Sequence, residues 1–489
     1  MASSAIYVLA LSLCLSSGFQ QGYIASVLNQ PYVEIEKYMN TSWIHMTGDP
    51  MLPATIDLLW SLLNVCFPIA TIFGQFAAAV LVRKIGRKKT AYVACSLYIP
   101  GTLLSAAAKW IPNAFELLFA GRIVWALGNG IASVNATVWI VECAPPMIRG
   151  RMAAMQEVFM AIGALFTQLL GVFFSTSSLW ELMFLPNCFI VVINMVLFGF
   201  VKESPQFLIE VKGDYVEARK ALASYHGVSD DAESLEEEIK VCEEALKKKQ
   251  EEKKSTTAEC SALEVMFMPW KATDPASKVV RLNAWIGLMV KVAYVFTGAR
   301  CLRAYSSFVL HELGGWTIQS ANIGSLINSI IRLPATLLPV FLVDRLGRRP
   351  MMLLSSAVAL VSLVTMEVAV SYGPSWKIVT MISLSCLLLF NAGGLGSISR
   401  FYCAELVPRS VLLQSVSILT AFEAGSKIGV EFAWYPLANL VGGWSLLLFS
   451  IPTILFFVLM TWLCPETCRK SVTQVLNESA QRRKIDASF

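Results

Sequence analysis

The amino-acid sequence predicts an all-α integral membrane protein with about twelve transmembrane helices in two six-helix pseudo-symmetric bundles. Hydrophobic residues make up 56% of the 489 residues and charged residues only 15%, whereas a soluble domain carries about a quarter charged residues. About twelve apolar stretches approach the roughly 20 residues that a helix needs to cross a bilayer. A basic turn with a central glycine, residues 83–89, recurs at residues 344–349 after a second apolar stretch. Such a repeat indicates two related halves, a layout typical of membrane carriers.

Each half contains six predicted spans. The cores in the first half are residues 6–28, 58–82, 91–108, 115–140, 152–174 and 182–201. The cores in the second half are residues 282–310, 318–343, 351–370, 378–403, 411–440 and 445–463. We expect the first span to be a retained helix and not a cleaved signal peptide, because no Lys or Arg precedes it.

The charged residues predict the orientation of the chain and its division into domains. Lys and Arg gather in alternate loops, which places both termini and the long central loop in the cytoplasm. The net charge of +5 therefore reflects positive-inside loops and not nucleic-acid binding. The expected domains are an N-terminal bundle, a cytoplasmic helical linker, a C-terminal bundle and a cytoplasmic tail, at residues 1–201, 202–278, 279–466 and 467–489.

Two loops outside the spans have sequence features of their own. In the central loop, Asp214–Gly227 and Ser229–Lys254 are predicted to form polar helices, and Gly227 is a typical helix stop. The longest outer loop, residues 29–57, contains Asn40-Thr41-Ser42, an acceptor sequence for N-glycosylation. We therefore expect Asn40 to be glycosylated in a eukaryotic host.

Neither a cofactor nor a catalytic function is expected. The 12 cysteines are scattered along the spans and the 3 histidines are far apart in sequence, so neither a disulfide frame nor a metal site is predicted. The sequence contains no nucleophile motif and no phosphate-binding loop, which argues against an enzyme. The expected partners are a small-molecule solute and the lipid bilayer, without nucleic acid or a required protein.

Several short motifs resemble those of the sugar-porter branch of the major facilitator superfamily, in particular the animal facilitative glucose transporters. The resemblance covers residues 18–467, and the motifs agree in order and spacing as well as in residues. They include Gln20-Gln21-Gly22-Tyr23, Gly86-Arg87-Lys88, Glu203-Ser204-Pro205-Gln206-Phe207, Asp344-Arg-Leu-Gly-Arg-Arg349 and Pro465-Glu466-Thr467. The resemblance implies a facilitative transporter (uniporter) of a hexose or similar small polar solute, which works by alternating access in the plasma membrane.

Charged residues at the predicted inner helix ends are candidates for an intracellular gate. Acids in both halves have cations one loop away, and such pairs would close the inner side and separate when the halves rock. The alternative is a set of ordinary surface salt bridges, each worth under about 1 kcal/mol. The candidate gate residues are Arg87, Glu142, Arg149, Asp344, Arg348, Arg349, Glu405 and Arg409.

The expected substrate site departs from the family pattern. In the family, amides and an aromatic residue hold the sugar, and a tryptophan follows two prolines in the tenth helix. Here Glu157 replaces a glutamine, Arg300 lies near the expected seventh-helix amides, and Arg400 stands where the tryptophan is expected. The positions that the resemblance assigns to substrate binding are Glu157, Gln168, Tyr294, Arg300, Asn328 and Arg400.

The charged residues at the expected substrate site allow two interpretations. Glu157 could pair with Arg300 or Arg400, or the excess arginine could bind an anionic substrate, because guanidinium suits carboxylates. On the eleventh span, Glu423, Lys427 and Glu431 have i,i+4 spacing, which predicts mutual neutralisation; a water-lined cavity face is the alternative.

The cargo and the coupling mode follow from the resemblance only in part. Symporting relatives carry an Asp where this chain has Ile24, which favours uniport. Three hypotheses stay open: a hexose-like cargo, a small organic anion (urate- or carboxylate-like), and a transport-inactive nutrient sensor.

Overall fold

The computed structural model consists of two compact helical units, Met1–Thr257 and Ala258–Phe489. It describes residues 3–144, 146–227, 239, 262–268, 270, 273–337, 345–468, 470 and 472–485. Side chains at residues 141, 146–151, 153–154, 262–263, 409–414 and 416–417 lie outside the description. Each unit is described separately below.

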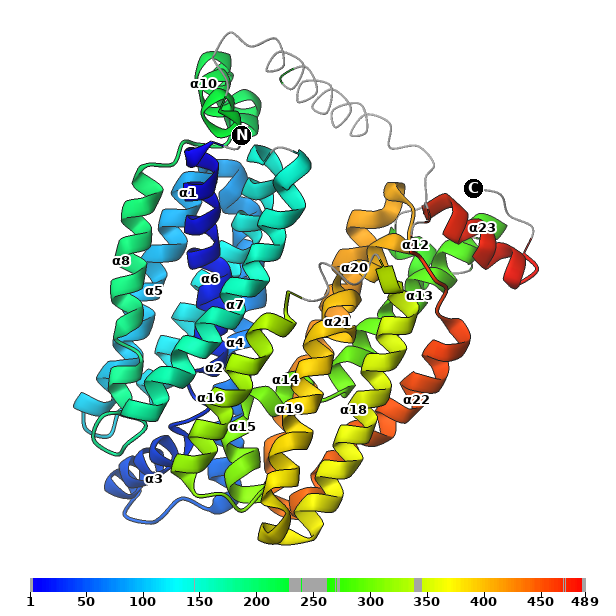
Figure 1. The fold of residues 1–489 in the computed structure, drawn as a ribbon. Coiled ribbons are helices and arrows are strands. Elements are labelled where there is room, and N and C mark those ends of the chain that lie inside the picture. Colours follow the sequence, from blue (N-terminus) through cyan, green and yellow to red (C-terminus); the bar gives the residue numbers. More distant parts are fainter. Residues whose placement is uncertain are drawn as a thin grey trace. The chain divides into compact units, whose positions relative to one another are not determined.

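Unit 1 is a bundle of long helices with short helices at its ends (Figure 1). The first span is a continuous helical stretch made of α1 (Ser4–Leu13), the π-helical η1 (Cys14–Phe19) and α2 (Gln20–Ser26). The other long helices are α4 (Pro53–Ile85), α5 (Arg87–Trp110), α6 (Glu116–Cys143), α7 (Pro146–Phe174) and α8 (Pro186–Gly199). The short helices are α3 (Tyr32–Thr47), η2 (Trp180–Met183), α9 (Pro205–Phe207), η3 (Leu208–Lys212) and α10 (Tyr215–His226).

The first span packs closely against α7 because glycines remove the side chains between the two backbones. A Cβ atom on Gly22 would lie 2.0 Å from the carbonyl oxygen of Met160, and one on Gly163 would lie 2.2 Å from that of Phe19. Any larger residue would force these helices apart. This packing aligns the polar residues of the first span with those of α6 and α8: Gln20 donates to Asn187 at 2.7 Å and accepts from the indole of Trp125 at 2.9 Å.

Unit 2 is a second helical bundle in which two of the spans are broken (Figure 1). Its long helices are α13 (Pro275–Phe296), α16 (Ile318–Ala335), α18 (Arg348–Ser371), α19 (Lys377–Gly393), α21 (Arg409–Val441) and α22 (Leu447–Leu463). The helices that continue the broken spans are α14 (Ala299–Ala304) after α13 and α20 (Leu395–Glu405) after α19. The remaining helices are α12 (Ala262–Phe267), α15 (Ser306–Phe308), η4 (Val309–Leu313), η5 (Gly373–Trp376), η6 (Gly442–Leu446) and α23 (Val472–Arg482).

The break between α13 and α14 depends on Gly298. This residue has φ +71°, a left-handed conformation that favours glycine, and a Cβ there would lie 2.7 Å from the ring of Phe449. The freed backbone and side-chain groups are satisfied locally: Thr453 donates to the Phe296 carbonyl at 3.1 Å, and Asn391 donates to the Thr297 hydroxyl at 2.8 Å. Non-helical backbone inside a membrane is tolerated where it is buried in protein in this way.

The all-α membrane fold is confirmed. In the described part of the chain, nine stretches are long and apolar enough to cross a membrane, and one of them, Ile418–Leu463, covers both α21 and α22. The α1–η1–α2 stretch and α16 occupy two further predicted spans. The predicted spans 282–310 and 378–403 correspond to the stretches Pro275–Ala304 and Gly373–Glu405, and the helix of each is interrupted at a glycine, Gly298 or Gly394.

The structure of the predicted loops differs from expectation in one place, where there is an additional helix, and matches it in another. The predicted outer loop 29–57 contains a four-turn helix, α3. In the predicted linker, α10 has Asp214 as N-cap and Gly227, with φ +70°, as its C-terminal stop, so the helix at 214–227 is confirmed. The second predicted linker helix, 229–254, lies outside the described residues except for Ile239.

Candidate functional site

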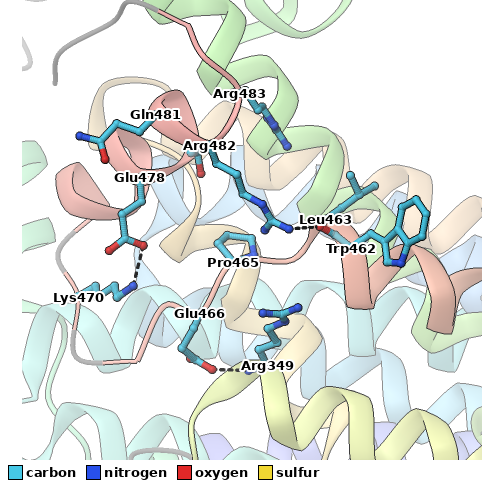
Figure 2. Close-up of a pocket in the computed structure, with 11 residues that line it drawn as sticks. Arg349, Trp462, Leu463, Pro465, Glu466, Lys470, Glu478, Gln481, Arg482 and Arg483 are labelled. Carbon is cyan, nitrogen blue, oxygen red and sulfur yellow. Dashed lines mark hydrogen bonds and ion pairs between the residues drawn. The ribbon is translucent and has the colours of Figure 1, made fainter.

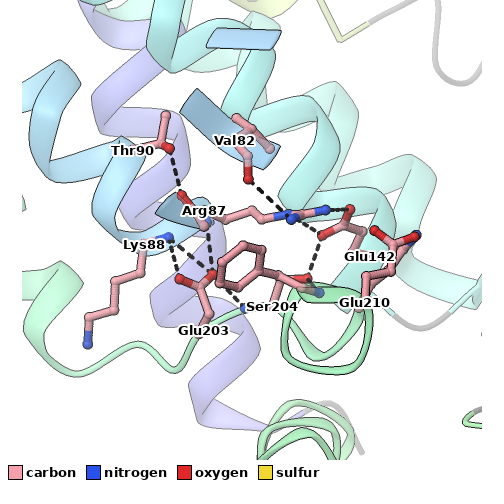
Figure 3. A network of polar contacts seen from close by, with 11 residues as sticks. Val82, Arg87, Lys88, Thr90, Glu142, Glu203, Ser204 and Glu210 are labelled. Carbon is pink, nitrogen blue, oxygen red and sulfur yellow. Dashed lines mark hydrogen bonds and ion pairs between the residues drawn. The ribbon is translucent and has the colours of Figure 1, made fainter. Parts of the chain in front are cut away.

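The first functional feature is a network of polar contacts at one end of unit 1, the end that loop charge predicts to be cytoplasmic (Figure 3). Glu142, at the end of α6, accepts from Arg87 Nε at 2.8 Å and also from the hydroxyl of Ser204. Glu203 caps the start of α5, because its carboxylate accepts from the backbone nitrogens of Arg87 (2.9 Å) and Lys88 (3.1 Å). The network therefore joins the α4–α5 turn, the end of α6 and the segment before α9.

Unit 2 contains the same network built from equivalent residues. Glu405 at the end of α20 accepts from Arg348 at 3.3 Å and from the hydroxyl of Thr467. Glu466 caps the start of α18 by accepting from the backbone nitrogens of Arg348 (2.9 Å) and Arg349 (3.0 Å). We call the two networks the unit 1 clamp (Arg87, Glu142, Glu203, Ser204) and the unit 2 clamp (Arg348, Glu405, Glu466, Thr467).

A glycine is required in each clamp where the capping carboxylate approaches the turn. Gly86 and Gly347 have φ of +90° and +91°, and a Cβ on either would lie within 3.0 Å of the capping carboxylate, at 2.6 Å from Glu203 and 2.9 Å from Glu466. Both the conformation and the close approach exclude larger residues. The repeated glycine-basic turn thus has a physical function: it presents two backbone N–H groups to a carboxylate far along the chain.

Figure 2 shows the surroundings of the unit 2 clamp. A pocket of about 600 Å³ lies between the end of α22 and α23, with Glu466 and Arg349 on its wall. Two arginines donate to the last carbonyls of α22, Arg349 to Thr461 and Arg482 to Trp462, each at 2.5 Å. A third cation, Lys470, pairs with Glu478 at 2.6 Å. Cations at the C-terminal end of a helix are favourably placed for its dipole.

The structure shows ion pairs for two of the candidate gate acids, and their role in a gate stays a prediction. Glu142 pairs with Arg87, and the side chain of Arg149 lies outside the described residues. Glu405 pairs with Arg348, although Arg409, whose side chain is also outside the description, is closer in sequence. Asp344 lies outside the described residues. Both described ion pairs connect elements of one unit, because the helix ends that bring them together belong to the same bundle.

The second feature is a set of charged side chains inside unit 2. Glu423 on α21 accepts from Lys291 on α13 at 2.7 Å and from Lys427 one turn further along α21. Lys291 and Glu423 are both buried. The predicted neutralisation of Glu423 by Lys427 is therefore confirmed, and Lys291, which lies far away in the sequence, takes part in it as well.

Arg300 forms the second buried pair of this region. It lies on α14 just after the break at Gly298, and its Nε donates to Glu431 on α21 at 2.7 Å. The pair is largely shielded, with 22% of Arg300 and 10% of Glu431 exposed. The pairing of Glu431 with Arg300 was not among the expected ones. The alternative in which Glu157 pairs with Arg300 or Arg400 stays a prediction.

The remaining predicted binding residues divide between the two units. Glu157 and Gln168 lie on α7 of unit 1, where Gln168 is buried. In unit 2, Tyr294 lies at the end of α13, with Lys427 Nζ 5.6 Å from its ring centre, and Arg400 is exposed on α20. Asn328 on α16 is buried and accepts from Ser385. Their assignment to substrate binding stays a prediction.

Asn40, the predicted glycosylation site, lies on α3. Its side-chain oxygen accepts from the backbone nitrogen of Met51 at 2.9 Å. The residue is half-buried. Its glycosylation stays a prediction.

Sequence reasoning missed several residues of both features. Glu203 and Glu466 belong to recognised motifs, but only the structure shows them capping helices more than a hundred residues away. The repeated order of a glycine-basic turn, an acid, and then Glu-Ser or Glu-Thr was an available signal. Lys291 and Arg332 were overlooked because each is a single cation in an apolar stretch, and Arg303 was overlooked because it follows Arg300 in a segment without a motif.

Comparisons with known proteins agree with this geometry. A family model described as "Sugar (and other) transporter" matches residues 9–478. The chain is 24% identical to facilitated glucose transporter member 1 of Gallus gallus over 480 residues, which cover 96% of this chain and 92% of the relative. It is 26% identical to member 4 of Bos taurus, with coverage of 96% and 89%.

Among solved structures, the inward-open xylose transporter XylE from E. coli matches with a TM-score of 0.77. The match has 18% identity and covers 97% of this chain and 99% of XylE, so this likeness concerns the fold. A partially occluded inward-open structure of XylE matches with a TM-score of 0.74. The family match, which spans almost the whole chain, and the two helical units with their repeated clamps lead to one assignment: the chain belongs to the sugar (and other) transporter family.

Proposed function

We propose that this protein is a facilitative carrier, a uniporter that moves a small polar solute of sugar size across the plasma membrane by alternating access. The observation that carries the proposal is the clamp present once in each unit. Each clamp fixes the ends of three chain segments to one another through charge-assisted hydrogen bonds. Alternating access requires two bundles that move as rigid bodies, and the clamps supply that rigidity at one end of each bundle.

The buried position of Ile24 supports uniport. Symporting relatives are expected to carry an acid at this position, and here the side chain is an isoleucine with no exposed surface. A residue that cannot titrate cannot take up and release the coupled proton. The loop charges support a cytoplasmic location for both termini and both clamps.

Counterflow in vesicles tests this proposal. Purified protein is reconstituted, the vesicles are loaded with one unlabelled solute from a panel of hexoses, pentoses, polyols and carboxylates, and entry of the labelled solute is followed. A uniporter should accumulate label transiently without a pH gradient, and a protonophore should leave the accumulation unchanged. Empty vesicles are the control. Absence of counterflow for every solute would overturn transport, and collapse by the protonophore would overturn uniport.

A clamp variant connects this activity to the structure. Glu466→Ala removes the cap of α18 and should lower the maximal rate of counterflow severalfold while the half-saturating concentration changes little. Glu217→Ala is a matched control, because Glu217 pairs only with exposed Lys220, at 3.6 Å on the surface of α10. Equal maximal rates of counterflow for the two variants would show that the unit 2 clamp does not contribute to transport.

A further inference from the structure

The membrane-spanning interior of unit 2 contains far more positive than negative charge. Among the described residues, five cations and two carboxylates, Glu423 and Glu431, lie there, which leaves an excess of three positive charges. We call the five cations the cation cluster: Lys291, Arg300, Arg303, Arg332 and Lys427. They belong to four helices, α13, α14, α16 and α21.

The two carboxylates are already engaged by other members of the cluster. Glu423 accepts from Lys291 and Lys427, and Glu431 accepts from Arg300. No carboxylate in the described part of the chain lies within ion-pair distance of Arg303 or Arg332. Arg332 is within electrostatic range of Arg303, and Arg303 is within range of both Arg300 and Glu431.

The helix registers bring these side chains together. Arg300 and Arg303 have i,i+3 spacing and share one face of α14. Asn328 and Arg332 have i,i+4 spacing and share one face of α16. The hydroxyls of Ser306, on α15 just after α14, and Ser325, on α16, lie 2.6 Å apart, so the two segments are adjacent. The phenol of Tyr294 lies within electrostatic range of both arginines.

A neutral donor accompanies the arginines. Asn328 is 4% exposed, its oxygen accepts from Ser385, and its Nδ2 has no acceptor among the described residues. The bond from Ser385 fixes the orientation of the amide, so Nδ2 is held as a donor. A buried donor without an acceptor is costly in a protein that binds nothing at that position.

Like charges inside a membrane protein lower its stability, and their presence is explained when a ligand of opposite charge binds them. We propose that Arg303 and Arg332 bind the carboxylate of an organic anion of sugar size, with Asn328 Nδ2 donating to one of its hydroxyl or carboxylate oxygens. Guanidinium groups present paired N–H donors in the geometry that carboxylates accept. This inference rests on the proposed carrier function and specifies its cargo.

Two matched solutes test the charge requirement. Glucuronate and glucose share the same pyranose ring and differ only at C6, which is a carboxylate in glucuronate and a hydroxymethyl group in glucose. Binding is measured as thermal stabilisation of the purified full-length protein, and transport is measured by counterflow. Glucuronate should stabilise the protein and exchange, whereas glucose at the same concentration should do neither. Stabilisation by glucose alone, or by glucose 6-phosphate without glucuronate, would overturn the carboxylate assignment.

Arginine variants distinguish a binding site from a structural cluster. Arg303→Gln and Arg332→Gln should each weaken glucuronate binding about tenfold to a hundredfold, the value of a charge-assisted hydrogen bond. Without ligand, the same variants should unfold at an equal or higher temperature than the parent, because each relieves repulsion. A structural role predicts the reverse, a lower unfolding temperature with unchanged relative affinity, and that result would refute the proposal.

The controls keep the carrier function and the anion site separable. Lys220→Gln removes an exposed cation from α10 and should leave the binding of glucuronate unchanged. Arg303→Lys retains the charge and should retain part of the affinity. Counterflow of a neutral sugar without anion binding would refute the anion site and support the carrier. Anion binding without counterflow of any solute would refute the carrier and support the site.

Discussion

Removing the carboxylate of Glu203 should loosen unit 1 locally, at the clamp. This carboxylate accepts from three backbone nitrogens, those of Arg87 at 2.9 Å, Lys88 at 3.1 Å and Ser204 at 2.8 Å. The first two are the opening N–H groups of α5. Loss of a helix N-cap costs about 1–2 kcal/mol, and loss of a negative charge beside the helix N-terminus costs about 0.3–1 kcal/mol more. We expect Glu203→Ala to lower the free energy of local opening by about 1.3–3 kcal/mol.

Buried cysteines provide the assay. Cys143 follows Glu142 in unit 1 and Cys464 precedes Glu466 in unit 2, and both have no exposed surface. A thiol reagent labels each of them only when the surrounding structure opens. Glu203→Ala should raise the labelling rate of Cys143 by about 8- to 140-fold, because every 1.4 kcal/mol is a factor of ten, and should leave the labelling rate of Cys464 nearly unchanged. Mass spectrometry of the labelled peptides measures both rates in one sample.

The matched variants define what would contradict this argument. Glu203→Gln keeps an acceptor oxygen without the charge and should show a smaller increase. Glu466→Ala should reverse the pattern and expose Cys464, because it removes the equivalent cap from α18. An unchanged rate at Cys143, or an equal rise at both cysteines, would show that Glu203 does not clamp unit 1 locally.

Three further predictions concern other parts of the molecule. Gly298→Ala should destabilise unit 2 by at least about 1–2 kcal/mol from the left-handed backbone, with the Phe449 clash in addition, whereas Gly425→Ala, at a helical position with open space, should be harmless in thermal unfolding. Glu431→Gln should cost about 3–5 kcal/mol because it leaves Arg300 as a shielded cation, and Arg300→Gln added to it should recover part of the loss in a double-mutant cycle. Asn40→Gln should lower the gel band in a eukaryotic host as glycosidase does, and an unchanged band after both treatments would contradict use of the site.

The span positions were predictable because a span is a local property of the sequence. A run of apolar residues of bilayer length has few alternatives to a helix, since every backbone polar group must be satisfied within the segment. The end of α4 at the turn before Arg87 and the end of α10 at Gly227 also followed from nearby residues. Spans and helix ends that depend only on nearby residues could therefore be predicted from the sequence.

The helix breaks and the clamp caps were not predictable in this way. Gly298 occurs in an apolar stretch like other helical glycines, and its left-handed conformation depends on the ring of Phe449, about 150 residues away. The caps likewise depend on carboxylates 116 and 118 residues from the nitrogens they accept from. In each case the residues near one partner give no indication of the other partner, so the contact is determined by tertiary packing.

The same reason explains why three of the five residues in the cation cluster were missed. Arg300 and Arg400 stood out because a family motif predicts neutral residues there, while Arg303 follows Arg300 in a segment without a motif. Its relation to Arg332 depends on the register of α14, and that register is set by the break at Gly298. The orientation of a side chain that depends on a helix break cannot be predicted before the break is known.

The clamps are repeated in both units and the cation cluster is not, and this difference agrees with their proposed functions. The clamps occur in both units with similar residue types in the same order. A mechanical element of a two-bundle carrier must act on both bundles, so its duplication is kept. The cation cluster has no such requirement, because a solute needs only one set of charged groups. In unit 1 the polar interior residues Gln20, Trp125 and Asn187 are neutral and bonded to one another. Repetition in this chain therefore accompanies movement, and asymmetry accompanies the choice of cargo.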